Sequence, residues 1–180
     1  MTAMSSTEHD SYTVRQLAGL TDAQIHGLAQ ILVDCVEGGA SVSFMHPLSL
    51  SKAQAFWRRI ASDVESGARA LLVAEDATGI IGTVQVVLDQ PENQPHRADV
   101  SKMLVHRRAR RRGVGAALMR AAEDAARRSG KSLLVLDTAS GDAERLYARV
   151  GWTLAGIIPD YALWPQGGLC STSVYYRKLD

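Results

Sequence analysis

Residues 107–116 read RRARRRGVGA, a run of five arginines in six positions followed by two glycines separated by a valine. The preceding residues, KMLV (102–105), have the apolar character of a strand, and from Gly113 the apolar residues recur at helical spacing. A helix amino terminus has unpaired N–H groups and partial positive charge, and glycines let a ligand approach the backbone closely. The stretch therefore predicts a strand, an anion-binding loop and a helix, in that order.

The positive charge of the chain is concentrated in this one run. The net charge is +1 and would be −4 without the five arginines, and no second basic cluster of similar density occurs. Proteins that bind nucleic acid present lysine and arginine over a wide face, so that many counterions are released. We therefore expect a phosphate-bearing small ligand and no nucleic-acid partner. A module that binds nucleic acid, or senses a phosphate-bearing ligand, without catalysis is the alternative.

Length and composition predict an ordinary globular chain. The sequence is 46% hydrophobic and 22% charged, and no linker divides its 180 residues, so we expect one domain over residues 1–180 with residues 1–10 flexible. The segment MTAMSSTEHDSY (1–12) has neither a basic start nor an apolar run, and no apolar stretch approaches 18 residues. We expect a cytoplasmic protein without a membrane partner.

None of the cysteines and histidines has the spacing of a metal site. Cys35 and Cys170 form no paired ligand motif, and His46, His96 and His106 form no His-x-x-x-His pair or Cys/His cluster. Cys35 falls on the apolar face of a predicted helix, where core packing is its expected role. We therefore expect no metal.

Apolar periodicity and breaker residues predict an α+β order. Ser51 with Gln54 has the spacing of a capping box for the second helix, and Thr21 or Asp22 is the expected cap of the first. SLLVLDT (132–138) is apolar without alternation, which indicates a strand covered on both faces. The expected strands are 12–17, 68–76, 79–88, 97–105, 132–138, one from 152 and 173–179, and the expected helices are 21–39, 51–67, 113–129 and 143–150.

Two motifs resemble those of the GNAT superfamily of N-acetyltransferases. Arg110 to Gly115 is similar to the superfamily's acetyl-CoA-binding pattern Arg/Gln-x-x-Gly-x-Gly/Ala, whereas the P-loop and dinucleotide patterns are absent, the latter because position 118 is leucine. Ala143 to Trp152 resembles the segment Ala-x-x-Leu-Tyr-x-x-x-Gly-Phe/Trp. The two occur in the superfamily's order and spacing, and with the element order the resemblance covers nearly the whole chain.

Four further stretches are similar to one branch, the tabtoxin-resistance acetyltransferases, which N-acetylate an amino-acid-like β-lactam toxin. They are GGASVSFM (38–45), RADVSKMLV (97–105), LDT (136–138) and the tail PDYALWPQGGL with VYYRK. The resemblance implies an α+β, three-layer fold with a mixed, mostly antiparallel sheet splayed between its two central parallel strands and helices on both faces. It also implies a role in antibiotic or toxin resistance.

The resemblance implies acetyl-CoA as co-substrate. Pantetheine would enter between the strand that ends at Val105 and the next strand at Asp137, and an N–H at Leu104 or Val105 would polarise the acetyl carbonyl. Ser140 stands where many members have asparagine, and Arg107 where the motif's approach often has proline. The implied cofactor-binding residues are Met103, Leu104, Val105, Arg110, Arg111, Arg112, Gly113, Val114, Gly115, Ala116, Ser140 and Tyr147.

Three residues are candidates for catalysis. By resemblance Tyr147 is the acid that serves the departing thiolate, and its alternative role is packing on the sheet. Asp99 and Asp137 are carboxylates on otherwise apolar strands, so either could accept the amine's proton, directly or through water. Alternatively Asp99 pairs with Arg97 or His96, and Asp137 caps the following helix.

The implied reaction is transfer of acetyl to a primary amine by direct attack in a ternary complex. The candidate acceptor-binding residues are Ser43, Phe44 and Met45 on a long loop over 38–47, Trp164 on a second loop over 160–170, and Asp99 on the strand 97–105. Such loops favour a small-molecule amine, an amino-acid-like toxin or antibiotic, over a protein amino terminus or lysine. Phe44 and Met45 covering the core, and Trp164 in a plain hairpin tip, are the alternatives. The final strands could pair two copies across a two-fold axis as a homodimer.

Overall fold

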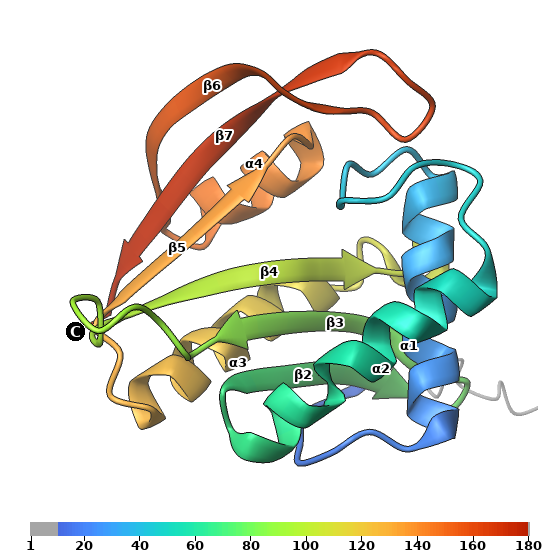
Figure 1. Ribbon diagram of the computed structural model, residues 1–180, viewed down its shortest axis with the longest axis horizontal. Helices are drawn as coiled ribbons and strands as arrows, with labels where there is room; N and C mark the ends of the chain where they lie inside the picture. Colours follow the sequence, from blue (N-terminus) through green and yellow to red (C-terminus); the bar gives the residue numbers. More distant parts are fainter. Residues whose placement is uncertain (1–10, 180) are drawn as a thin grey trace, which may run out of the picture.

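A seven-stranded mixed sheet runs through the computed structural model, which describes residues 11–179 (Figure 1). In sheet order its strands are β1 (Thr13–Leu17), β2 (Arg69–Asp76), β3 (Gly79–Val87), β4 (Arg97–Val105), β5 (Leu133–Thr138), β7 (Leu169–Lys178) and β6 (Thr153–Leu163). Only β4 and β5 are parallel, as a strand-helix-strand unit requires, and the other neighbours are antiparallel. The predicted flexibility of residues 1–10 lies outside the described residues.

The helices are α1 (Asp22–Glu37), α2 (Leu50–Ser66), α3 (Val114–Arg128) and α4 (Gly141–Arg149), with a short 3₁₀ turn, η1 (Arg107–Ala109), before α3. The predicted element order is confirmed. Thr21 caps α1 in a capping box with Gln24. The predicted cap of α2 is wrong: Ser49, not Ser51, accepts from the N–H of Lys52, because the helix begins two residues earlier.

The helices cover the two faces of the sheet in pairs (Figure 1). On one face α1 and α2 bury Trp57 and Leu28, among others, against Leu71 and Val73 of β2. On the other face Leu118 and other α3 residues, with Leu146 and Tyr147 of α4, form a second core. This is the expected three-layer α+β arrangement. Within residues 11–179, no helix has the length and apolar character needed to cross a membrane.

The two central parallel strands separate after a short paired segment. β4 and β5 are in register only from Arg97 with Leu133 to Asp99 with Val135, and beyond this point the strands diverge, as Figure 1 shows. On its other side, β4 shifts register with β3 between Ser101 and Leu104, which bulges the strand. The predicted splay of the sheet is therefore confirmed.

Helix α3 lies close enough to β3 that a side chain at one glycine would crowd its neighbours. A Cβ at Gly82 would lie 3.0 Å from Leu118 Cδ1, 3.0 Å from Val114 Cγ1 and 3.2 Å from the carbonyl oxygen of Leu104. The close approach fixes the first turns of α3 beside the point where β4 and β5 diverge.

We expect Gly82→Ala to lower the free energy of unfolding by about 1–3 kcal/mol, because the added methyl group overpacks this contact. Gly156→Ala is the matched control, since a Cβ there meets nothing within 4 Å and the cost should stay below about 0.5 kcal/mol. Urea denaturation followed by circular dichroism measures both. Equal stability of the two variants would contradict the close packing.

Candidate active site

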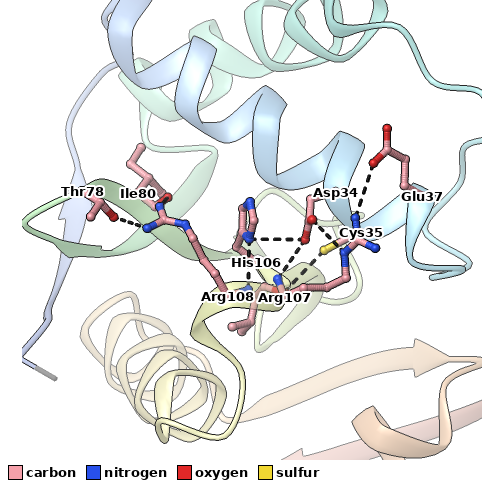
Figure 2. Close-up of polar contacts among 9 residues, drawn as sticks. Asp34, Cys35, Glu37, Thr78, Ile80, His106, Arg107 and Arg108 are labelled. Atoms are coloured by element: carbon pink, nitrogen blue, oxygen red, sulfur yellow. Dashed lines mark hydrogen bonds and ion pairs between the residues drawn. The ribbon is translucent and has the colours of Figure 1, made fainter. Parts of the chain in front are cut away.

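Three of the five arginines in the run after β4 bind acidic side chains of neighbouring elements. Arg107 donates from Nε to Asp34 Oδ1 at 2.8 Å and lies 3.4 Å from Glu37 of α1 (Figure 2). Arg108 hydrogen-bonds Thr78 and lies 3.9 Å from Asp76. Arg112 Nη1 lies 3.1 Å from Asp76 Oδ2. These three side chains hold the loop to the protein, a role for which the sequence showed no signal.

Asp34 is the central partner in this set of contacts. Its buried carboxylate also accepts from the backbone N–H of Arg107 at 2.8 Å. Burial alone would raise the pKa of this carboxyl group, but the hydrogen bonds from the backbone and guanidinium of Arg107, with the charge of Arg107, hold it below its usual range. His106 accepts from the N–H of Arg108 at Nδ1, so its neutral ring carries the proton on Nε2.

The loop ends at the start of α3, where backbone N–H groups lie before the first intrahelical hydrogen bond. Gly113 is the N-cap with φ 78° and supplies no side-chain cap, and the first intrahelical bond is donated by Ala117 to the carbonyl of Gly113. The N–H groups of residues 114–116 precede that bond and are thus available to an anion. Arg110 and Arg111 are exposed beside them, and Arg111 has a φ of 64°. The predicted phosphate-binding residues therefore lie together, with Arg112 directed to Asp76.

The two sequence motifs meet in space. A Cβ at Gly115 would lie 3.0 Å from Leu146 Cδ2 of α4, and Met103 Cε of β4 is 3.7 Å away. The contact joins α3 to α4 across the diverging strands. A side chain at Gly115 would therefore have to displace Leu146 as well as hinder access to the backbone.

Tyr147 follows Leu146 on α4 and is buried. Its ring contacts those of Trp152 and Tyr175 at centroid distances of 6.1 and 5.8 Å. Burial, aided by the negative charge of Asp137, raises the pKa of its hydroxyl above the usual value. The phenol therefore remains protonated at neutral pH and can act only as a donor to an anion. The alternative role of Tyr147, packing on the sheet, is also seen.

A cavity of about 290 Å³ lies between the α1–α2 loop and the β6–β7 hairpin. Three predicted acceptor residues, Ser43, Phe44 and Met45, line it together with Asp137, one of the predicted carboxylates. The remaining lining residues are Ser41, Ala139, Tyr161, Ala162, Leu163, Ser171 and Thr172. Trp164 is not among them, although it follows Leu163: its backbone N–H closes the hairpin turn on the carbonyl of Gly168.

The two loops that enclose the cavity are joined directly. Ser41 Oγ donates to the carbonyl of Leu163 at 3.2 Å, and the N–H of His46 donates to the carbonyl of Pro165 at 2.9 Å. Gln166 Nε2 reaches the carbonyl of Val36 at 3.5 Å. The two loops are thus bridged over the cavity, which is not left open as a groove.

The two candidate carboxylates share one face of the sheet but differ in surroundings. Asp99 pairs in register with Val135, and Asp137 is two residues further along β5, so both project toward the side of α1 and α2. Asp99 is bound by Arg97 and by Gln90 Nε2, as its alternative role predicted. Asp137 accepts from Thr172 Oγ1 at 2.9 Å and faces the cavity.

The sequence analysis missed Lys102, a lysine in the β4 bulge. Its Nζ donates to Ser43 Oγ at 3.1 Å, at the boundary of the cavity. Lys102 is the first residue of the segment KMLV (102–105), and the sequence does not indicate which face of the sheet its side chain takes. The described residues contain no group of three or more His, Cys, Asp or Glu side chains placed to hold a metal ion, and the absence of a metal stays a prediction.

The chain matches one family over most of its length. Residues 25–152 fit the model of the Acetyltransferase (GNAT) family. The chain therefore belongs to the GNAT acetyltransferases, and the predicted enzyme class and fold are confirmed. The narrower tabtoxin-resistance branch stays a prediction.

Solved structures similar to this chain carry the same fold. One is yncA from Salmonella typhimurium, determined with its cofactor acetyl-CoA, at 20% identity and TM-score 0.75 over 94% of each chain. A second is the ribosomal-protein-alanine N-acetyltransferase from Brucella melitensis, at 20% identity and TM-score 0.75 over 93% of this chain and 99% of that one. A third is a GCN5-related N-acetyltransferase from Kribbella flavida, at 25% identity and TM-score 0.72 over 93% and 98%.

We expect Asp34→Asn to lower the free energy of unfolding by about 1.5–3 kcal/mol at pH 7, because it removes the charge that Arg107 binds. The pKa of Asp34 is lowered in the folded state, so its contribution is complete above the unfolded pKa of about 3.9 and is lost as pH falls through the folded pKa. The difference from wild type should therefore shrink below about pH 4.

Urea titrations at pH 7 and pH 3.5 measure this effect. Asp124→Asn is the control, since that carboxylate is exposed and pairs only with Arg127 one turn away, and its loss should cost less than about 0.5 kcal/mol. A penalty for Asp34→Asn that is the same at both pH values would show that its charge is not what stabilises the loop.

Proposed function

We propose that this enzyme transfers acetyl from acetyl-CoA to the primary amine of a small molecule by direct attack in a ternary complex. The observation that carries the proposal is the placement of an anion-binding helix start and a bridged acceptor cavity at the two ends of one divergence between β4 and β5. Bound acetyl-CoA would supply the activated thioester. The chain's own residues would bind the two ends of acetyl-CoA and exclude water. They would also take one proton from the amine and donate another to the leaving sulfur.

The phosphate end would be bound by the backbone N–H groups of residues 114–116, with Arg110 and Arg111 adding attraction. Because three neighbouring arginines are already bound to carboxylates, the run offers too little free charge for a wide nucleic-acid surface. Met103, Leu104 and Val105, on the unpaired part of β4, are the proposed contacts for pantetheine, and Ser140, the N-cap of α4, is a further one.

The acceptor must lose a proton before it attacks, since an ammonium group has no lone pair. Asp137 is the better placed of the two carboxylates because it faces the cavity, whereas Asp99 is engaged by Arg97 and Gln90. We propose that Asp137, directly or through a water molecule, takes this proton. Tyr147 would donate to the sulfur as the C–S bond breaks, so that amide and free CoA thiol are the products.

The bridged loops favour a small acceptor. The contacts from Ser41 to Leu163 and from His46 to Pro165 cross the space that an extended peptide would need. A cavity of about 290 Å³ is of the size that holds a small organic molecule. An amino-acid-like toxin or antibiotic, as for the tabtoxin-resistance branch, is our candidate substrate class.

The central test is thiol release from acetyl-CoA with a panel of small amines, amino acids, β-lactam-bearing amino acids and peptides. We expect Tyr147→Phe to lower kcat by about 10²–10⁴-fold, because it removes the donor to the leaving sulfur. The dissociation constant for acetyl-CoA, measured by calorimetry, should stay unchanged.

Tyr176→Phe is the control, because this β7 residue does not line the acceptor cavity and should keep wild-type turnover. Full activity of Tyr147→Phe would remove the hydroxyl from the mechanism. Acetyl-CoA binding without thiol release for any amine would favour a CoA sensor instead, and acceptance of peptides alone would favour a protein N-acetyltransferase.

We also propose that a second copy of the chain covers β6. This strand forms one edge of the sheet, and six of the eight large exposed hydrophobic side chains of the described residues lie on it or at the start of β7. They are Leu154, Ile157, Ile158, Tyr161, Leu163 and Leu169. An apolar surface of this kind on one edge suits a two-fold interface.

Light scattering coupled to size exclusion tests the homodimer. Wild type should have twice the mass of the chain, and Ile157→Asp should shift it to a monomer, because Ile157 is 61% exposed in one copy and a charge there would be buried in the interface. Leu50→Asp, at the start of α2, is the matched control and should remain dimeric. A monomeric wild type at high micromolar concentration would overturn the proposal.

A further inference from the structure

Lys102 occupies an unusual place in the sheet. It lies in the β4 bulge, half-buried, with a φ of 49°, and its partner Ser43 has a φ of 74°. Non-glycine residues rarely adopt positive φ, and each such position costs about 1–3 kcal/mol unless the surroundings enforce it. Two strained residues thus meet through the 3.1 Å hydrogen bond between Lys102 Nζ and Ser43 Oγ.

The ammonium of Lys102 has no carboxylate partner at ion-pair distance within residues 11–179. Its contacts are the hydroxyl of Ser43 and the ring of Phe56, whose centroid is 5.7 Å from Nζ. Both interactions favour the charged form of the lysine. A half-buried cation without an ion-pair partner is costly, and the negative charge of Asp137 acts on this one only from beyond ion-pair distance.

The cavity therefore has a negative side chain on its wall and a positive side chain bonded to one of its wall residues. Asp137 lines it on the β5 side, and Lys102 stands behind Ser43 on the α1–α2 loop side. The two groups also act on each other: burial lowers the pKa of Lys102, and the negative charge of Asp137 opposes that shift. Such a pair is complementary to a small molecule that carries an ammonium and a carboxylate group.

We infer that Lys102, together with Ser43, binds a carboxylate of the acceptor, so that the enzyme selects amines that also carry an acid group. The inference rests on the proposed function and names the substrate class of the same site. The acceptor's amine would lie toward Asp137 and its carboxylate toward Lys102. Lys102 is then a specificity-determining residue, and it neither takes the amine's proton nor donates to the leaving sulfur.

The cofactor's phosphates are not the anion in question. Their proposed site is the start of α3, formed by residues 110–116, whereas the partner of Lys102 is Ser43, which lines the acceptor cavity. The direction of the lysine side chain assigns its charge to the acceptor and not to the cofactor.

The test compares acids with their amides. L-Serine, L-methionine and L-lysine, each beside its α-carboxamide, and the decarboxylated amines ethanolamine and cadaverine are assayed by thiol release. We expect acids to exceed their amides in kcat/KM by about 10–100-fold, the loss that follows removal of a charged hydrogen bond. In Lys102→Met the ratio should fall to about one through a higher KM for the acids, and Lys102→Arg should restore part of it.

Lys52→Met, which removes an exposed lysine of α2, is the control and should leave the ratio unchanged. If Lys102→Met does not fold, as judged by circular dichroism, Lys102→Gln carries the same comparison. Two results would overturn the inference. One is an equal kcat/KM for acids and for amines that lack an acid group, and the other is an equal loss of kcat/KM for acid and amide in Lys102→Met.

The outcomes for the two proposals are separate. Absence of thiol release with every amine tested, while acetyl-CoA still binds, would refute the proposed transferase reaction, and the inference on Lys102 would fall with it. Thiol release without preference for acids would leave the transferase reaction standing and refute only the role of Lys102.

Discussion

The arrangement of the candidate site depends on the short parallel pairing of β4 with β5, which ends after three residue pairs. Beyond that point β4 offers unpaired backbone on one side, while its bulge keeps it attached to β3 on the other. Beyond the last pair, Asp137 of β5 lines the cavity beside the β6–β7 hairpin, and α3 begins after the end of β4. The proposed phosphate end and the proposed acceptor end therefore both lie past the same irregularity. Had the two strands paired throughout, the same helices would cover a closed sheet without a site.

The arginine run illustrates how local charge is divided between folding and binding. Arg107, Arg108 and Arg112 are bound by carboxylates of α1 and of the β2–β3 turn, which leaves Arg110 and Arg111 exposed beside the first turn of α3. These ion pairs hold the loop against α1 and the β2–β3 turn, so Arg110 and Arg111 extend from a loop that is already held in place. A flexible run of five arginines would lose more side-chain entropy on binding the same anion.

Periodicity and breaker residues predicted the order of the elements correctly, because burial of one face of each helix and strand is a local property of the sequence. The partners of the arginines could not be predicted, since Asp34 is more than seventy positions from Arg107 and meets it only in the folded sheet. Lys102 was missed for a related reason: its orientation follows from a bulge, which depends on the register of β3. The divergence of β4 and β5 was predicted from family resemblance alone, because the sequences of both strands are those of ordinary apolar segments.

Gly115 shows that a motif can persist for reasons other than its chemistry. Its lack of a side chain lets Leu146 of the second motif pack within 3.0 Å of where a Cβ would be, so the two motifs constrain one another through helix contact. A descendant that lost the ability to transfer acetyl groups would still have to shift Leu146 to accept a side chain here. The presence of both motifs in a chain thus indicates first that this helix contact is kept, and the proposed role of Tyr147 has to be judged separately.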